Sequence, residues 1–97
     1  MLIVVFVLMS VHDPHPEHRD ALIGSMHRYG AAIAGKPGLV SVHTLADAGS
    51  ARLVGLAIFE SESDFEALAP LARAAVAHDP FAVWEKAPID GLRLSEV

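Results

Sequence analysis

The stretch from Leu2 to Val11, LIVVFVLMSV, is apolar at almost every position. Its branched and aromatic side chains favour an extended strand, and it is too short for the roughly 20 apolar residues of a membrane-spanning helix. No basic residue precedes the run and no small-residue cleavage site follows it, so a signal peptide is not indicated. We therefore expect a cytoplasmic protein whose first element is a buried strand.

A second stretch, Arg52 to Glu60 (RLVGLAIFE), is also apolar on both faces. Gly55 lies inside it, and a glycine within a strand often marks the close approach of another group. Each of these two strands therefore needs an apolar partner on either side of the sheet. Helices can cover one side, so the other side needs a second cover.

Two further strands are predicted, one near 39–46, between these two stretches in the sequence, and one near 88–97, after them. The loop 47–50, which holds Asp47 and Gly49, joins the first of them to the Arg52–Glu60 strand as a hairpin. Alternation predicts the residues that share a face: Val40, Val42, Thr44 and Ala46 against Leu39, Ser41, His43 and Leu45, and Leu92 and Leu94 against Arg93 and Ser95.

Proline, glycine and capping residues mark the helices. A first helix is expected to begin near Pro16 and to end at Gly35-Lys36-Pro37-Gly38, because proline fits a first turn and glycine a helix end. Its apolar stripe has helical spacing: Leu22, Met26, Tyr29 and Ile33. A second helix begins at Ser63-Asp64-Phe65-Glu66, interpreted as a capping box, and Pro70 should kink or break it. A short helix with Asp79 as its N-cap follows.

The predicted order is β-α-β-β-α-β, which is the ferredoxin-like plait of the α+β class. The 97 residues suffice for one domain, 1–97, with a four-stranded antiparallel sheet and both helices on one face. The other face would be bare and apolar in a monomer, which signals an interface. We expect a homodimer in which two sheets pack face to face as a dimeric α+β barrel.

The composition excludes several classes of protein. A hydrophobic fraction of 53% is incompatible with disorder. The net charge is −5 and the seven Lys and Arg residues are scattered singly, so nucleic-acid binding is not expected. The chain has no cysteine, which removes disulfides, zinc ribbons, iron–sulfur clusters and thiol catalysis.

Two segments resemble the antibiotic-biosynthesis-monooxygenase domain family of the dimeric α+β barrel superfamily. Gly35-Lys36-Pro37-Gly38-Leu39-Val40-Ser41-Val42 is similar to the family's Pro-Gly turn before its second strand. Ile58-Phe59-Glu60-Ser61-Glu62-Ser63-Asp64-Phe65 is similar to its aromatic, acidic and serine approach to the second helix. The resemblance covers most of the chain. It implies the plait and a group that includes cofactor-free quinone-forming oxygenases, haem-degrading enzymes and proteins without an established reaction.

Resemblances to two other groups of proteins give minor alternatives. His78-Asp79-Pro80-Phe81 is similar to the Asp-Pro-Phe segment of the YCII-related family, which implies a His–Asp pair, with His27 and Asp47 as the nearest candidates. The haem-degrading subgroup implies an Asn, a Trp and an axial His. His78 stands at the axial position, but Phe59 replaces the Trp and the chain contains no Asn.

Candidate site residues follow from chemistry and from the expected fold. His43 could deprotonate a substrate hydroxyl in the space between sheet and helices, with Tyr29 as the second catalytic candidate. Five residues are candidates for binding a planar substrate: Trp84, Arg93, His27, His78 and Phe59. The run His12, His15 and His18 is interpreted as solvated loop histidines rather than a metal site. For each candidate a purely structural role stays open.

Two functions stay open at this stage. One is a cofactor-independent monooxygenase that acts on a small planar aromatic or quinol without metal or flavin. The alternative is a non-catalytic or stress-associated dimeric binding protein of the same fold. Cavity volume separates them in part, because ligand pockets usually enclose about 300–1,000 Å³.

Overall fold

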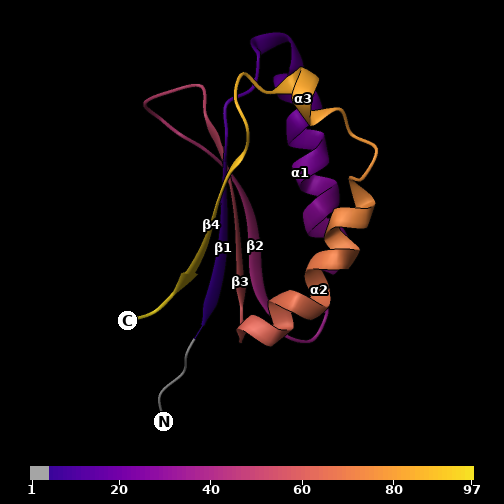
Figure 1. Cartoon of the computed structure of the whole chain (residues 1–97), viewed down its shortest axis with the longest axis vertical. Coiled ribbons are helices and arrows are strands. Elements are labelled where there is room, and N and C mark those ends of the chain that lie inside the picture. The colour runs from indigo at the N-terminus through magenta and orange to yellow at the C-terminus, as the bar shows by residue number, and fades with distance from the viewer. Residues whose placement is uncertain (1–4) are drawn as a thin grey trace.

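The strands and helices of the computed structural model, which describes residues 5–97, follow the predicted order (Figure 1). The elements are β1 (Phe6–His12), the 3-10 turn η1 (Pro16–His18), α1 (Arg19–Ile33), β2 (Leu39–Ala46), β3 (Leu53–Phe59), α2 (Glu62–Ala75), α3 (Phe81–Trp84) and β4 (Asp90–Ser95). The part of the predicted first strand at residues 2–4 lies outside the described residues.

The four strands form one antiparallel sheet in the order β2-β3-β1-β4. Both long helices, α1 and α2, lie on the same side of this sheet, as Figure 1 shows. The predicted α+β plait is therefore confirmed. No helix in the described part of the chain is long and apolar enough to cross a membrane.

Register divides β1 and β3 into two faces, because directly paired residues of antiparallel strands point the same way. Phe6 pairs with Phe59 and Ser10 with Gly55, and this set faces the helices. Together with α1 and α2 these strands form the core, whose buried members are Phe6, Ile33, Ala57, Phe59, Phe65, Leu68, Ala69 and Ala72. This cluster lies at the end of the plait near the start of β1, whereas at the other end the buried Leu53 pairs with the polar His12.

The face of the sheet away from the helices is almost entirely apolar. Register assigns to it Val7, Met9 and Val11 of β1, Val54, Leu56 and Ile58 of β3, Ser41, His43 and Leu45 of β2, and Asp90, Leu92 and Leu94 of β4. The opposition of Leu92 and Leu94 to Arg93 and Ser95 was predicted, and it is confirmed. Leu92 is 38% exposed and Leu94 is 40% exposed, so this face is open in the single chain.

The alternation predicted for β2 is interrupted near its start. The register shifts between Leu39 and Ser41, which leaves Val40 as the extra residue of a bulge. Leu39 consequently packs on the core on the same side as Val42, instead of sharing a face with Ser41. Gly38, at φ +94°, precedes the bulge, and a Cβ on it would lie 2.5 Å from the Asp64 carboxyl group. The Pro-Gly turn thus brings the chain close to α2.

Two helix starts differ from the prediction. Ser61, not Ser63, caps α2: its hydroxyl accepts the Asp64 amide N–H at 3.1 Å and bonds the Asp64 carboxylate at 2.7 Å. The capping box is therefore shifted by two residues. Helix α3 begins at Phe81, one residue later than predicted, so its N-cap is Pro80, whose side chain has no acceptor. The carboxylate of Asp79 binds Arg28.

Pro70 lies inside α2, which continues as one helix to Ala75. A proline removes one main-chain hydrogen bond and crowds the preceding turn, so a change of direction is expected there. Figure 1 shows the axis of α2 turning between its first and last turns. Of the two predicted outcomes, a kink and a break, the structure has the kink.

Candidate functional site

Strand β1 carries two polar residues on the face that is directed toward the helices. Ser10 and His12 are two positions apart, so their side chains point the same way. His12 had been predicted to lie in a solvated loop, but it is the last residue of β1 and its side chain is only 7% exposed. The strand extends one residue further than expected because His12 still pairs with Leu53 of β3.

The segment after β1 brings Glu85 to this place. Pro14 forms an isolated antiparallel bridge with Glu85. Two main-chain hydrogen bonds fix the bridge, from the His15 N–H to the Trp84 carbonyl (2.8 Å) and from the Lys86 N–H to the Asp13 carbonyl (2.9 Å). A proline has no N–H to donate, so its neighbours make both bonds. Glu85 thereby lies beside the end of β1.

Ser10, His12 and Glu85 form a hydrogen-bonded chain. His12 Nδ1 lies 3.0 Å from Oε2 of Glu85, and His12 Nε2 lies 2.8 Å from Oγ of Ser10. A carboxylate only accepts hydrogen bonds, so Nδ1 carries the proton of the neutral ring and donates it to Glu85. Nε2 is then the acceptor for the Ser10 hydroxyl. The side chain of Glu85 is 2% exposed, and its other oxygen, Oε1, is buried without a hydrogen-bond partner among residues 5–97.

Gly55 of β3 makes room for this chain of residues. A Cβ at position 55 would lie 2.6 Å from Oγ of Ser10 and 3.4 Å from the terminal methyl of Met26. Any larger residue would push the Ser10 hydroxyl away from His12. The glycine noted in the sequence therefore marks the close approach of a side chain, as expected.

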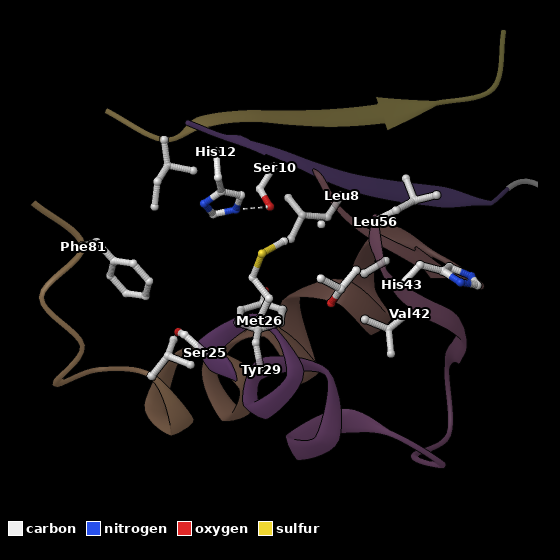
Figure 2. Close-up of a pocket in the computed structure, with 15 residues that line it drawn as sticks. Leu8, Ser10, His12, Ser25, Met26, Tyr29, Val42, His43, Leu56 and Phe81 are labelled. Atoms are coloured by element: carbon white, nitrogen blue, oxygen red, sulfur yellow. Dashed lines mark hydrogen bonds between the residues drawn. The ribbon is translucent and has the colours of Figure 1, made fainter. Parts of the chain in front are cut away.

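A cavity of about 230 Å³ lies between the sheet and the helices, with Ser10 and His12 on its wall. Figure 2 shows Met26 reaching toward Ser10 from α1 and Phe81 closing the side beyond His12. Three more hydroxyl groups line the cavity, those of Ser25, Tyr29 and Thr44, and the remaining wall is mostly apolar. The volume is below the usual range for drug-sized ligands and above the ~150 Å³ of a cavity that holds benzene.

Tyr29 is the predicted catalytic residue that lies at this cavity. Burial raises the pKa of the Tyr29 phenol above its usual value of 10.0, and the charge of Arg73 opposes part of that rise. A tyrosine is protonated at neutral pH even without this rise, so Tyr29 is a hydrogen-bond donor among the residues that line the cavity.

His43, the other predicted catalytic residue, borders the cavity at the edge of the sheet. Register pairs it with Leu56, which in turn pairs with Met9, so its side chain belongs to the face opposite Ser10. Figure 2 shows its ring directed away from that of His12. His43 also lines a shallow groove between α1 and β2 together with His27, so the structure brings these two predicted residues near one another.

The remaining predicted binding residues lie outside the cavity wall. Phe59 is completely buried in the core. The guanidinium of Arg93 lies 5.0 Å from the centre of the Phe65 ring and 3.9 Å from Glu62, at the core end of the plait. Trp84 packs edge-on against Phe81, with ring centres 5.7 Å apart. His78 is exposed after α2.

The structure does not show the His–Asp pair that resemblance to the YCII-related family implies for His27 and Asp47. Asp47 binds within its own hairpin, to the Gly49 N–H at 3.0 Å and to the Ser50 hydroxyl at 2.6 Å, and these bonds lower the pKa of its carboxyl. Its expected partner His27 lies on α1. Among residues 5–97, no group of three or more His, Asp and Glu side chains is placed to hold a metal ion.

None of the three members of the hydrogen-bonded chain was predicted as a site residue. One signal was present: Ser10 and His12 interrupt the apolar run at positions that share a face with Phe6 and Leu8. Nothing in the sequence identified Glu85, because its position depends on a bridge between segments about seventy residues apart.

Comparisons with known proteins agree on the fold. No family model and no curated protein matches the chain. Among solved structures, Rv0793 from Mycobacterium tuberculosis has a TM-score of 0.80 at 16% identity, covering 96% of this chain and 95% of that one. A candidate antibiotic biosynthesis monooxygenase from Nitrosomonas europaea has a TM-score of 0.74 at 16% identity, covering 96% and 90%. One from Chloroflexus aurantiacus J-10-fl has a TM-score of 0.71 at 18% identity, covering 96% and 93%.

Proposed function

We propose that this protein is a cofactor-independent monooxygenase that takes a small, single-ring hydroxyaromatic or quinol substrate, with His12 as the base. The observation that carries the proposal is the His12–Glu85 pair beside a small, mostly apolar cavity. The names of two structural neighbours, candidate antibiotic biosynthesis monooxygenases at 16% and 18% identity, support it at the level of the fold.

His12 is suited to remove a proton from a phenol. Its Nδ1–H is held by Glu85, which fixes the ring and stabilises the imidazolium that forms when Nε2 takes a proton. The proton reaches Nε2 directly or through the Ser10 hydroxyl, which lies 2.8 Å from it. General-base assistance of this kind contributes about 10²–10⁴-fold to a rate.

The cavity restricts the substrate to a single ring. Its volume of about 230 Å³ exceeds what benzene needs, but it falls short of the 300 Å³ at which ordinary ligand pockets begin. A mostly apolar wall lowers the local dielectric constant, which strengthens the interaction of the phenolate with the few polar groups present. The protonated Tyr29 hydroxyl is a donor for that phenolate.

The substrate itself supplies the electrons for the reaction. Loss of the hydroxyl proton gives an anion that can pass electrons to O₂. One oxygen atom bonds to a ring carbon that bears two hydrogens in the keto tautomer, and loss of water then leaves a carbonyl. The carbon is oxidised by four electrons, one oxygen atom stays in the product and the other leaves as water. No metal, flavin or external reductant is needed for that balance.

We also propose that two copies of the chain pair through the sheet face that α1 and α2 leave bare. Among the described residues that register assigns to that face, Asp90, the first residue of β4, alone carries a formal charge. A face with so little charge can meet its own copy with little repulsion, although the chain carries a net charge of −5. The second sheet would cover the apolar side chains that remain exposed.

Oxygen uptake tests the proposed reaction. The wild-type protein, treated with EDTA, should consume O₂ with single-ring quinols such as methylhydroquinone and not with the three-ring anthrone. His12→Ala should lower the rate by about 100-fold or more. His18→Ala, which changes a histidine of the neighbouring turn, is the matched control and should keep the rate. Binding of the quinols without O₂ uptake would instead support the non-catalytic alternative, and an unchanged rate in His12→Ala would overturn the role of His12.

A further inference from the structure

We propose that Ser10, His12 and Glu85 are a nucleophile–base–acid triad that cleaves small activated esters through a covalent acyl group on Ser10. This activity goes beyond the proposed oxygenase function, because it uses the Ser10 oxygen as a nucleophile and needs no O₂. It rests on the chain of contacts among these three residues and on the cavity beside them.

The two distances are those of a working triad. A nucleophile and its base lie about 2.6–3.2 Å apart when the base can take the proton, and the base is oriented by a third group. Ser10 Oγ lies 2.8 Å from Nε2 of His12, and Nδ1 of His12 lies 3.0 Å from Glu85. The proton of the Ser10 hydroxyl is therefore directed at the free lone pair of the ring. The same roles occur on unrelated folds, so they are recognised by geometry rather than by order in the sequence.

The surroundings argue against a purely structural role. A carboxylate with a buried, unpartnered oxygen is unfavourable, and an apolar side chain in its place would usually be as stable or more stable. Gly55 likewise weakens the centre of β3 relative to a residue with a side chain. A role in positioning Ser10 and His12 explains both features. Glu85 orients the His12 ring, and Gly55 leaves space for the Ser10 hydroxyl.

The chemistry is complete without any further reagent except water. Ser10 Oγ attacks the ester carbonyl while its proton passes to Nε2 of His12. The carbon–oxygen bond to the leaving group then breaks, and His12 returns the proton to the departing oxygen. Water, activated by His12 in the same way, cleaves the acyl–Ser10 bond and releases the carboxylic acid.

The developing oxyanion must be stabilised by side chains. Strand β1 lies between β3 and β4, so its main-chain N–H groups are directed to the ladders on either side. Ser25, Tyr29 and Thr44 carry hydroxyl groups and line the cavity beside Ser10 and His12. A phenol is protonated at neutral pH and donates a hydrogen bond, so Tyr29 is the donor we assign to the oxyanion.

Cavity size defines the class of ester. A space of about 230 Å³ accommodates one aromatic ring with a short acyl group and excludes long acyl chains. Phenyl esters of acetic acid satisfy this limit, and their phenolate leaves readily. The proposed substrate class is therefore short-chain esters of single-ring phenols.

Covalent labelling tests the triad on the wild-type protein. Incubation with diisopropyl fluorophosphate should add one phosphoryl group per chain, and peptide mass spectrometry should locate it on Ser10. An adduct on a different residue, or no adduct at all, would overturn the proposal. Because this measurement needs no variant, it does not depend on whether a substituted protein folds.

Hydrolysis of p-nitrophenyl acetate under anaerobic conditions gives the second readout. Ser10→Ala and His12→Ala should each lower the rate by about 100-fold or more, and Glu85→Gln should lower it less. Ser95→Ala, an exposed serine of β4, is the matched control and should keep the rate. Folding of each variant is checked by circular dichroism. Equal rates in wild type and Ser10→Ala would refute the nucleophile.

The experiments distinguish failure of the oxygenase proposal from failure of the triad proposal. Labelling of Ser10 without O₂ uptake would remove the oxygenase and keep the triad. Uptake of O₂ by quinols without labelling would remove the triad and keep the oxygenase.

Discussion

The imidazole of His12 and the carboxylate of Glu85 share a buried hydrogen bond of 3.0 Å, although 73 residues separate them in the sequence. One comes from the end of the first strand and the other from the residue after the last helical turn. Their contact joins the end of β1 to the segment after α3, beside the cavity. The proposed chemistry depends on this contact, and so does part of the stability.

Removal of both partners should cost less than the sum of the two single removals. His12→Leu leaves the buried Glu85 carboxylate without its hydrogen bond to His12, which should lower the free energy of unfolding by about 1–3 kcal/mol. Glu85→Leu should cost a similar amount, because it leaves the buried Nδ1–H of His12 without this acceptor. The double variant removes both polar groups, so its loss should be smaller than the sum. Urea unfolding followed by circular dichroism gives the three values, and strict additivity would mean that the contact does not couple the residues.

Gly55→Ala should displace the Ser10 hydroxyl from its hydrogen bond with His12. The new methyl group would lie 2.6 Å from Oγ of Ser10, so the hydroxyl must rotate away and lose its bond to His12. We expect a loss of about 1–3 kcal/mol in unfolding free energy and loss of Ser10 labelling by the fluorophosphate.

Gly24→Ala is the matched control for that substitution. Gly24 lies within α1 and a Cβ there has no neighbour within 4 Å. Alanine should therefore stabilise the helix by about 0.5–1 kcal/mol and leave labelling unchanged. If Gly55→Ala behaved like Gly24→Ala, the close approach to Ser10 would not matter in solution.

Tyr29 should titrate at higher pH than a free tyrosine. It is the single tyrosine of the chain, so absorbance at 295 nm during an alkaline titration reports on it alone. Burial raises its pKa above 10.0 in the folded protein. The unfolded chain loses this proton first, so the contribution of Tyr29 to stability is present below pH 10 and is lost as the pH rises through the folded pKa. A titration midpoint that is the same in buffer and in urea would contradict the burial.

The pair between Arg28 and Asp79 should stabilise the protein in a pH-dependent way. Their nearest atoms lie 2.9 Å apart, and contacts of Asp79 with Ser25 and then Arg28 lower the pKa of its carboxyl below 3.8. The contribution is therefore present above pH 3.8 and is lost as the pH falls through the lower, folded value.

Melting curves of wild type and Asp79→Asn check this expectation. Wild type should melt higher at pH 7, and the difference should shrink below pH 3.8 and at high salt, because the Arg28 side chain is 52% exposed. A difference that is the same at pH 7 and pH 2.5 would assign it to something other than the charge.

The proposed dimer should depend on the sheet face that α1 and α2 leave bare. A Leu92→Asp, Leu94→Asp double variant places two charges on that face, so it should convert the proposed dimer into a monomer in sedimentation experiments. Val83→Asp changes an apolar residue of α3 that is more exposed, at 58%, and should leave the mass unchanged. A wild-type protein that sediments as a stable monomer at high concentration would remove the dimer.

Much of the fold was accessible from the sequence. The order of elements, the bounds of β2 and the opposition of Leu92 to Arg93 follow from periodicity, proline and glycine, which act over a few residues. Local errors arose where two signals competed, as at the cap of α2, where Ser61 and Ser63 both fit. The bulge at Val40 was also missed, because alternation alone does not reveal where a strand skips a residue.

The site was decided by tertiary structure. Residue type could mark His43 and Tyr29 as reactive, but only the register of the sheet assigns the His43 ring to the face opposite Ser10. The position of Glu85 requires the bridge to Pro14, which forms only when the last and first segments meet. Periodicity is a property of neighbouring residues, whereas a hydrogen bond between His12 and Glu85 depends on the whole path of the chain between them.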